Sequence, residues 1–129
     1  MADPVLVVDL DGTIAKYENG FQGDTIIEEP IIKVVNVLHR LYDEGWIIRI
    51  HSCRCNLQFQ PKDNPELPYR VIMDYMKDNG IKWTNIVHQI EGKPYADVYL
   101  DDRSAGYNPN WTEEEMYNEI IETYRRVSR

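Results

Sequence analysis

The chain contains little cysteine, little positive charge and no long hydrophobic run. Its only cysteines, Cys53 and Cys55, are one residue apart, too close for ordinary disulfide geometry in an extended chain. We therefore expect reduced thiols and a cytoplasmic protein. A zinc site is not favoured, because no second pair of ligands lies nearby in the sequence.

Membrane association is not expected either. No stretch approaches the roughly 18 consecutive apolar residues that a membrane span needs. Residues 1–4 lead directly into an apolar segment, without the basic region or the cleavage site of a signal peptide. The sequence thus predicts no membrane partner.

Acidic residues outnumber basic ones, 22 Asp and Glu against 14 Lys and Arg, which gives a formal net charge of −8. This balance argues against nucleic acid as a general partner, because its phosphates would be repelled at long range. A small phosphorylated substrate remains compatible with it. A bound divalent cation and a few local Lys or Arg side chains can reverse the field at one site.

The order of apolar patterns predicts one α/β domain over residues 1–129, because a chain of this length has room for a single core. Strands are expected at 5–8, 46–50, 85–88 and 96–100, and helices between Pro30 and Gly45, at about 69–79 and from Thr112 onwards. This alternation favours a compact Rossmann-like three-layer sandwich with a mostly parallel sheet. The polar segment at about 13–27 contains Asn19-Gly20, a pair that favours a hairpin turn.

The strongest local signal is Asp9-Leu10-Asp11-Gly12-Thr13, directly after the first expected strand. From average residue frequencies, such a motif arises by chance in on the order of one chain in a thousand. Asp9 and Asp11 lie on the same side of an extended chain, and Gly12 lets the backbone turn beside them. Two such carboxylates repel unless they share a proton or a cation. A hard, oxygen-seeking Mg²⁺ is the natural solution.

Other reactive residue types follow the neighbouring strands. Ser52 and Arg54 follow the second expected strand, and Asp101 and Asp102 follow the fourth. Because ligands of parallel sheets bind beyond the carboxyl ends of the strands, we expect these side chains to gather near Asp9.

These residues make the chain similar to the haloacid dehalogenase superfamily. Its four motifs are matched in order over residues 5–102 by the motif at 9–13, Ser52, Lys93 and Asp101-Asp102. The resemblance implies a magnesium-dependent phosphatase that hydrolyses a phosphomonoester, either a sugar phosphate or a nucleotide. The segments between the motifs are too short for a separate cap domain, so we expect an open site guarded by a flap hairpin at about 13–27.

The resemblance also implies a role for each residue. Asp9 would attack phosphorus and form an aspartyl-phosphate. Asp11 would protonate the leaving oxygen and then take a proton from the attacking water. The phosphate would be bound by Ser52, Lys93 and, unless it pairs with a carboxylate instead, Arg54.

The implied Mg²⁺ ligands are a carboxylate oxygen of Asp9, the backbone carbonyl of Asp11, and Asp101. Asp102 would bind the ion directly or through water. Spacing alone leaves open which of the last two is the primary ligand.

Two other classes of protein share parts of this residue pattern. A phospho-accepting signalling receiver uses similar residues, but its acidic pair follows the first strand and its accepting Asp follows a middle strand. In this chain the Asp9-Leu10-Asp11 motif comes first and the Asp101-Asp102 pair comes last, so this class is disfavoured. A catalytically idle binding module with the same fold is weakened because every expected catalytic position is filled. An uncapped site makes a homo-oligomer plausible, with a partner subunit supplying the lid.

Overall fold

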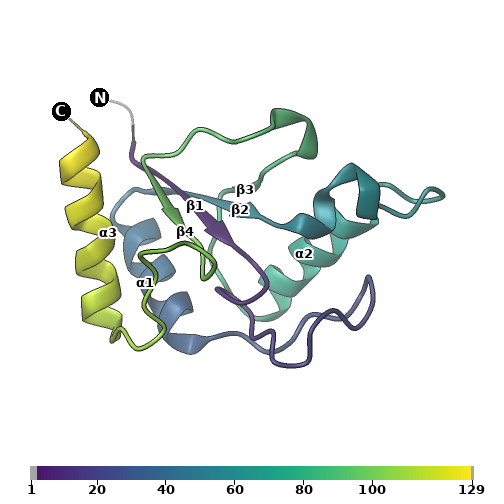
Figure 1. Cartoon of the computed structure of the whole chain (residues 1–129), viewed down its shortest axis with the longest axis horizontal. Coiled ribbons are helices and arrows are strands. Elements are labelled where there is room, and N and C mark those ends of the chain that lie inside the picture. Colours follow the sequence, from purple (N-terminus) through teal and green to yellow (C-terminus); the bar gives the residue numbers. More distant parts are fainter. Residues whose placement is uncertain (1–2, 129) are drawn as a thin grey trace.

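A four-stranded parallel sheet lies at the centre of the protein, with the strand order β3-β2-β1-β4 (Figure 1). The computed structural model describes residues 3–128, so residues 1–2 and 129 of the expected domain lie outside it. The strands are β1 (Val5–Asp9), β2 (Ile47–His51), β3 (Asn85–Ile86) and β4 (Val98–Leu100); the helices are α1 (Ile32–Asp43), α2 (Leu67–Asp78) and α3 (Glu113–Val127). The predicted α/β fold with a parallel sheet is confirmed.

Strand β1 is central and pairs in parallel with both β2 and β4. Val8 is opposite Ile50 on one side and Leu100 on the other, and Asp9 is opposite His51. This register brings the carboxyl ends of three strands to the same edge of the sheet. Residues that follow these strands therefore emerge next to one another, although they are far apart in the sequence.

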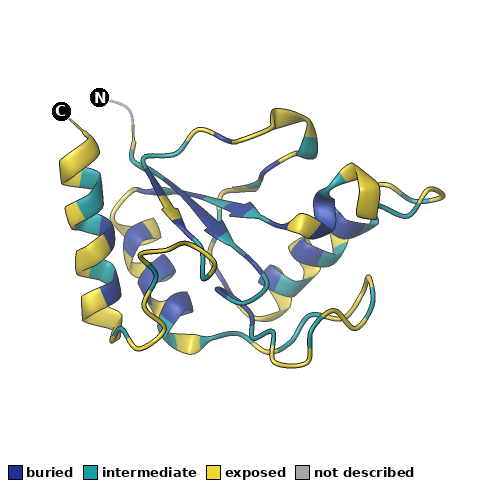
Figure 2. Ribbon diagram, in the orientation of Figure 1, coloured by how far each residue is buried: buried dark blue, intermediate teal, exposed yellow. Residues whose placement is uncertain are grey.

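All three α-helices contribute to one hydrophobic core on a single face of the sheet. Alternate strand residues, among them Leu6, Val8 and Ile48, are fully buried there. The inward residues of the helices join the same cluster: Val34, Leu38 and Leu41 from α1, Ile72 and Met76 from α2, Met116 and Ile120 from α3. Figure 2 shows this as a buried stripe along each helix. The amphipathic patterns in the sequence correspond to these stripes.

The opposite face of the sheet is covered by the segment between β3 and β4, which includes the short 3₁₀ helix η3 (Gln89–Glu91). Arg49 of β2 forms a 2.8 Å ion pair with Glu91, and the Tyr99 hydroxyl of β4 donates to the carbonyl of Pro94. In Figure 1 this green segment passes along the upper edge of the view. The third layer of the Rossmann-like sandwich is thus a loop rather than a long helix.

The predicted hairpin at 13–27 is regular only at its base. Ala15 and Pro30 form an isolated antiparallel bridge, and the Lys16 N–H donates to the Glu29 carbonyl at 2.9 Å. Between them, within the described residues, the chain has turns but no strand. Gly20, with a φ of +67°, forms the turn at its tip. The Glu28 carboxylate accepts the backbone N–H groups of Glu18 and Asn19 across the loop, so a side chain takes the place of the usual strand ladder. We call residues 16–29 the flap.

No helix within residues 3–128 combines the length and the apolar character needed to cross a bilayer.

Candidate active site

Three aspartates from two strand ends converge at the carboxyl edge of the sheet. One carboxylate oxygen each from Asp9, Asp101 and Asp102 lies within 4.8 Å of the others. Asp9 ends β1, and the other two follow β4, its neighbour in the sheet. The expected meeting of the first and fourth strands' acidic residues is therefore observed.

The convergence of these carboxylates disfavours the charged form of Asp9. Burial raises the pKa of Asp9 to about 8, and the negative charges of Asp101, Asp102 and Asp11 contribute to the rise. Arg103 opposes the shift and lowers this pKa. Carboxylates so close together need a proton or a cation between them. Their hard oxygen donors suit Mg²⁺, so the residues present fit that ion.

Thr13 and Gly12 attach the turn after β1 to Asp102. The Thr13 hydroxyl donates to the Asp102 carboxylate at 3.1 Å and accepts the Asp102 backbone N–H at 3.0 Å. Thr13 is fully buried. Gly12 has a φ of +93°, and a Cβ atom at this position would lie 2.4 Å from an Asp102 carboxylate oxygen. Only glycine allows this approach. The motif residues beside the aspartates thus fix the position of Asp102.

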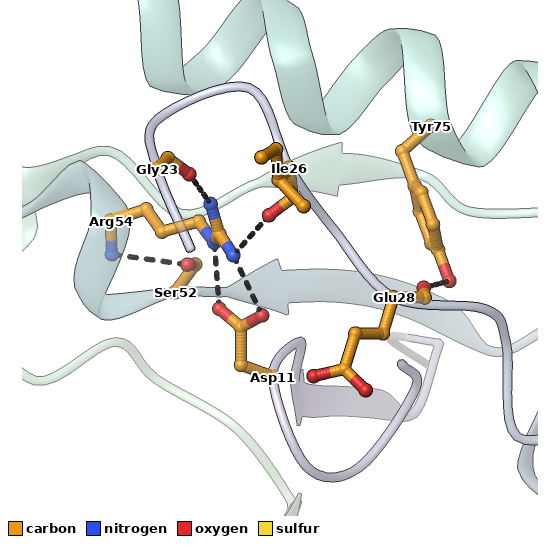
Figure 3. A network of polar contacts seen from close by, with 7 residues as sticks. All are labelled: Asp11, Gly23, Ile26, Glu28, Ser52, Arg54 and Tyr75. Carbon is orange, nitrogen blue, oxygen red and sulfur yellow. Dashed lines mark hydrogen bonds and ion pairs between the residues drawn. The ribbon is translucent and has the colours of Figure 1, made fainter. Parts of the chain in front are cut away.

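Asp11 is held by Arg54 (Figure 3). The Arg54 Nε donates to one Asp11 carboxylate oxygen at 2.8 Å, and its Nη2 donates to the other at 3.1 Å. The Arg54 side chain is only 8% exposed and that of Asp11 19%, so this bidentate pair is largely shielded from water. Of the two roles expected for Arg54, pairing with a carboxylate is the one observed.

The same guanidinium group also contacts the flap. Arg54 donates from Nη1 to the Gly23 carbonyl at 3.2 Å and from Nη2 to the Ile26 carbonyl at 2.8 Å. A guanidinium has five N–H donors, and four of them are now accounted for. One Nη1 hydrogen at most remains for a substrate phosphate. Arg54 therefore joins the turn after β1, the end of β2 and the flap.

Ser52 is at the end of β2, as expected, but its side chain is only 3% exposed. Its Oγ accepts the backbone N–H of Arg54 at 3.1 Å and so caps the 3₁₀ helix η1 (Cys53–Cys55). This helix turns the chain so that Arg54 points back toward Asp11 (Figure 3). Ser52 is not among the residues that line the cavity described below. The structure thus shows the strand-end cap, and the expected phosphate contact of Ser52 stays a prediction.

Lys93, the expected phosphate ligand, lies away from the cavity in the structure, and its phosphate contact stays a prediction. Lys93 Nζ lies 5.1 Å from the ring centroid of Tyr99, and Lys93 does not line the cavity. The reason is the segment between β3 and β4, which lies on the outer face of the sheet and is exposed at Lys93. With Pro94 buried beside it, the lysine is directed to the Tyr99 ring.

A cavity of about 400 Å³ lies over the carboxyl edge of the sheet. Its lining combines charged and aromatic side chains: Asp9, Asp11, Tyr17, Phe21, Asp24, His51, Cys53, Arg54, Phe59, Pro68, Asp101 and Arg103. Its size lies within the range of small-molecule sites. One cavity is thus lined by the Asp11–Arg54 pair and by Asp9 and Asp101, two of the three aspartates in the acidic cluster of Asp9, Asp101 and Asp102.

Two solved structures share this fold. The conserved protein of a Bacteroides thetaiotaomicron locus aligns over 94% of this chain and 92% of its own, with 23% identity and a TM-score of 0.65. A structural-genomics target from Vibrio cholerae aligns over 95% and 98%, with 18% identity and a TM-score of 0.57. These likenesses show the fold alone. No protein-family model matches the chain, and no curated protein matches it.

Eight of the twelve described residues that line the cavity are not among the site residues predicted from the sequence: Tyr17, Phe21, Asp24, His51, Cys53, Phe59, Pro68 and Arg103. Phe21 of the flap and Phe59 of the 3₁₀ helix η2 (Leu57–Phe59) lie in segments without a motif. Arg103 could have been found, because it directly follows Asp101 and Asp102 at the end of β4. Its positive charge faces Asp9 closely enough to lower that group's pKa.

Proposed function

We propose that the protein is a magnesium-dependent phosphomonoester hydrolase of the haloacid dehalogenase superfamily, with Asp9 as its nucleophile. The observation that carries the proposal is the convergence of Asp9, Asp101 and Asp102 within 4.8 Å, at a place where Asp9 and Asp101 line a cavity of small-molecule size. A carboxylate whose pKa is raised by burial and by neighbouring charges is a common feature of functional sites.

Asp9, Asp101 and Asp102 are the residues that would hold the cation. The backbone carbonyl of Asp11 is a further proposed ligand. When bound, Mg²⁺ would screen the aspartates from an incoming phosphate and stabilise the charge of the transition state. The raised pKa of Asp9 supports this assignment, because burial and the neighbouring aspartates both disfavour its charged form unless a cation is bound.

Asp9 has two tasks in the proposed reaction. Its carboxylate attacks phosphorus while the bond from phosphorus to the ester oxygen breaks, which leaves an aspartyl-phosphate and the freed alcohol. Water then attacks phosphorus, the bond to Asp9 breaks, and inorganic phosphate leaves. Arg103, which lines the same cavity, can balance the negative charge near Asp9.

Asp11 is the proposed general acid and base, giving a proton to the ester oxygen and taking one from the attacking water. Both of its oxygens are bound to Arg54. Each oxygen accepts one N–H and keeps a second lone pair, which is where the substrate or the water would exchange a proton. Arg54 orients Asp11 for this exchange.

The proposed compartment is the cytoplasm, which the two free cysteines support. The alternative of an idle module lacks a specific observation in its favour. An idle module would not need an acidic cluster that disfavours its own ionisation.

The test is turnover of an aryl phosphate with Mg²⁺ by the wild type and by Asp9→Asn. Removal of a nucleophile typically costs several orders of magnitude, so we expect a loss of about 10³-fold or more. Asp74→Asn removes an exposed carboxylate from α2 and is the matched control, with unchanged activity. Equal activity in the wild type and Asp9→Asn would remove Asp9 as the nucleophile.

A further inference from the structure

We propose that the substrate carries an aromatic ring, as a nucleoside monophosphate does, and that this ring packs on an aromatic wall of the cavity. The inference rests on the proposed function and names the leaving group of the same site. The aromatic wall consists of Tyr17 and Phe21 of the flap and Phe59 of η2, with Pro68 of α2 beside them.

The aromatic wall exposes apolar surface that a ligand can cover. Phe21 is 57% exposed and Phe59 is 56% exposed, although both line a concave site. Exposed apolar patches in a cleft mark places where binding removes surface from water. Planar rings are the groups that aromatic side chains bind best, by stacking or edge-to-face contact. The aromatic wall shares its cavity with the proposed chemistry, because Asp9 and Asp101 of the acidic cluster line it too.

The flap side of the wall is anchored before any ligand binds. Arg54 holds the Gly23 and Ile26 carbonyls, and its Cζ lies 5.2 Å from the ring centroid of Phe21. Farther along the flap, the Tyr75 hydroxyl of α2 donates to the Glu28 carbonyl at 2.7 Å (Figure 3). A wall held in this way loses little conformational entropy when a ring binds.

The chemistry of the wall favours a ring over a bare sugar. The hydroxyl groups of a sugar need hydrogen-bond partners, and of the four wall residues only Tyr17 offers a polar side-chain atom. A polynucleotide is disfavoured by the net charge of −8. A phosphate on a small leaving group with one ring fits both ends of the cavity.

The sharpest comparison is a nucleoside 5′-monophosphate against ribose 5-phosphate. The two substrates share the 5′ leaving oxygen and differ in the base. Stacking on aromatic side chains should raise kcat/KM by about tenfold or more for the nucleotide. Benzyl phosphate and cyclohexylmethyl phosphate form a second pair, which separates an aromatic ring from a saturated one of similar size without a sugar. Equal kcat/KM within both pairs would overturn the inference and leave the proposed function intact.

Substitutions locate the preference on the wall. In each substrate pair, the preference is the kcat/KM of the aromatic substrate divided by that of the non-aromatic one. Phe59→Ala and Phe21→Ala should each reduce this ratio by about fivefold to tenfold, mainly by raising KM for the aromatic substrate. Leu57→Ala is the matched control, because Leu57 is 70% exposed on the same 3₁₀ helix and does not line the cavity. An unchanged ratio in both phenylalanine variants contradicts the assignment.

A binding measurement separates this inference from the proposed function. Benzylphosphonate and cyclohexylmethylphosphonate cannot be hydrolysed, so calorimetry with Mg²⁺ reports their affinity without turnover. We expect the benzyl compound to bind about tenfold more tightly. If no phosphate ester is hydrolysed but this difference is found, the proposed hydrolase function is wrong and the proposed binding of a ring on the aromatic wall is supported. If the two phosphonates bind equally, the proposed binding of a ring on the aromatic wall is wrong.

Discussion

Arg54 and Asp11 form a bidentate ion pair, at 2.8 Å and 3.1 Å, between residues 43 positions apart in the chain. The same arginine donates to two flap carbonyls, so the proposed general acid and the flap share one anchor. Arg54 is therefore a positioning residue, and its loss should affect both Asp11 and the flap.

Arg54→Ala should loosen the flap and leave the Asp11 charge unpaired. Breaking a largely buried pair by removing one partner typically costs about 3–5 kcal/mol. We expect amide hydrogen exchange to accelerate at 23–28, the flap residues next to the arginine. Arg49→Ala removes an arginine paired with Glu91 on the outer face of the sheet, so it should leave flap exchange unchanged. Unaltered exchange at 23–28 in Arg54→Ala would contradict the anchor.

Gly12→Ala should displace Asp102 and weaken metal binding. The new Cβ would lie 2.4 Å from an Asp102 carboxylate oxygen, in addition to the strain of a positive φ. Gly20→Ala isolates the second effect, because Gly20 also has a positive φ but nothing within 4 Å of its Cβ position. Strain alone costs about 1–3 kcal/mol. Calorimetric titration with Mg²⁺ should show a loss of affinity for Gly12→Ala only, and equal affinities in the two variants would contradict the role of Gly12.

Thr13→Val should cost about 0.5–1.5 kcal/mol of unfolding free energy, because it removes two partly buried hydrogen bonds between Thr13 and Asp102. Thr13→Ser keeps the hydroxyl and should retain most of the stability and the Mg²⁺ affinity. Urea unfolding of the two variants measures the difference. If both variants lose the same stability, the hydrogen bonds to Asp102 are not its source.

Without metal, the raised pKa of Asp9 should make stability fall as pH rises. The unfolded chain releases this proton near the ordinary pKa of 3.8, whereas the folded protein keeps it until its pKa of about 8. Between these values the folded state binds more protons, so stability decreases with pH. In EDTA at pH 8, Asp9→Asn should therefore melt higher than the wild type, on the order of 2–5 °C.

The control for this prediction is the same comparison near pH 4, where the two melting temperatures should converge. Adding Mg²⁺ should stabilise the wild type more at pH 8 than at pH 5, because the ion binds the ionised cluster. A wild type that gains stability over Asp9→Asn between pH 4 and pH 8 in EDTA would contradict the assignment.

Local patterns in the sequence predicted the elements but not the contacts between distant loops. The run 5–8 and the helical pattern after Pro30 carry their own periodicity, so β1 and α1 were predicted within a few residues. The convergence of Asp9 with Asp101 followed from the rule that ligands bind at the carboxyl ends of parallel strands.

The contacts of Arg54 and Lys93 could not be predicted in this way. The direction of Arg54 depends on the 3₁₀ turn that Ser52 caps, and that turn has no periodic signal. The position of Lys93 depends on how the loop before β4 crosses the outer face of the sheet. The flap had a turn pair at Asn19-Gly20, but beyond the backbone bridge at its base it is held by the Glu28 side chain rather than by a strand ladder.

The central claim is that Asp9 carries the phosphoryl group during turnover, and acid quenching tests it most directly. Wild type and Asp11→Asn are mixed with an aryl phosphate and Mg²⁺, quenched within one turnover, and analysed by peptide mass spectrometry. A phosphoryl group should be found on Asp9, with more in Asp11→Asn, because that variant lacks the base for the second step. Release of the phenol with no phosphoryl group on Asp9 in either protein, or with the group on another residue, would contradict the account.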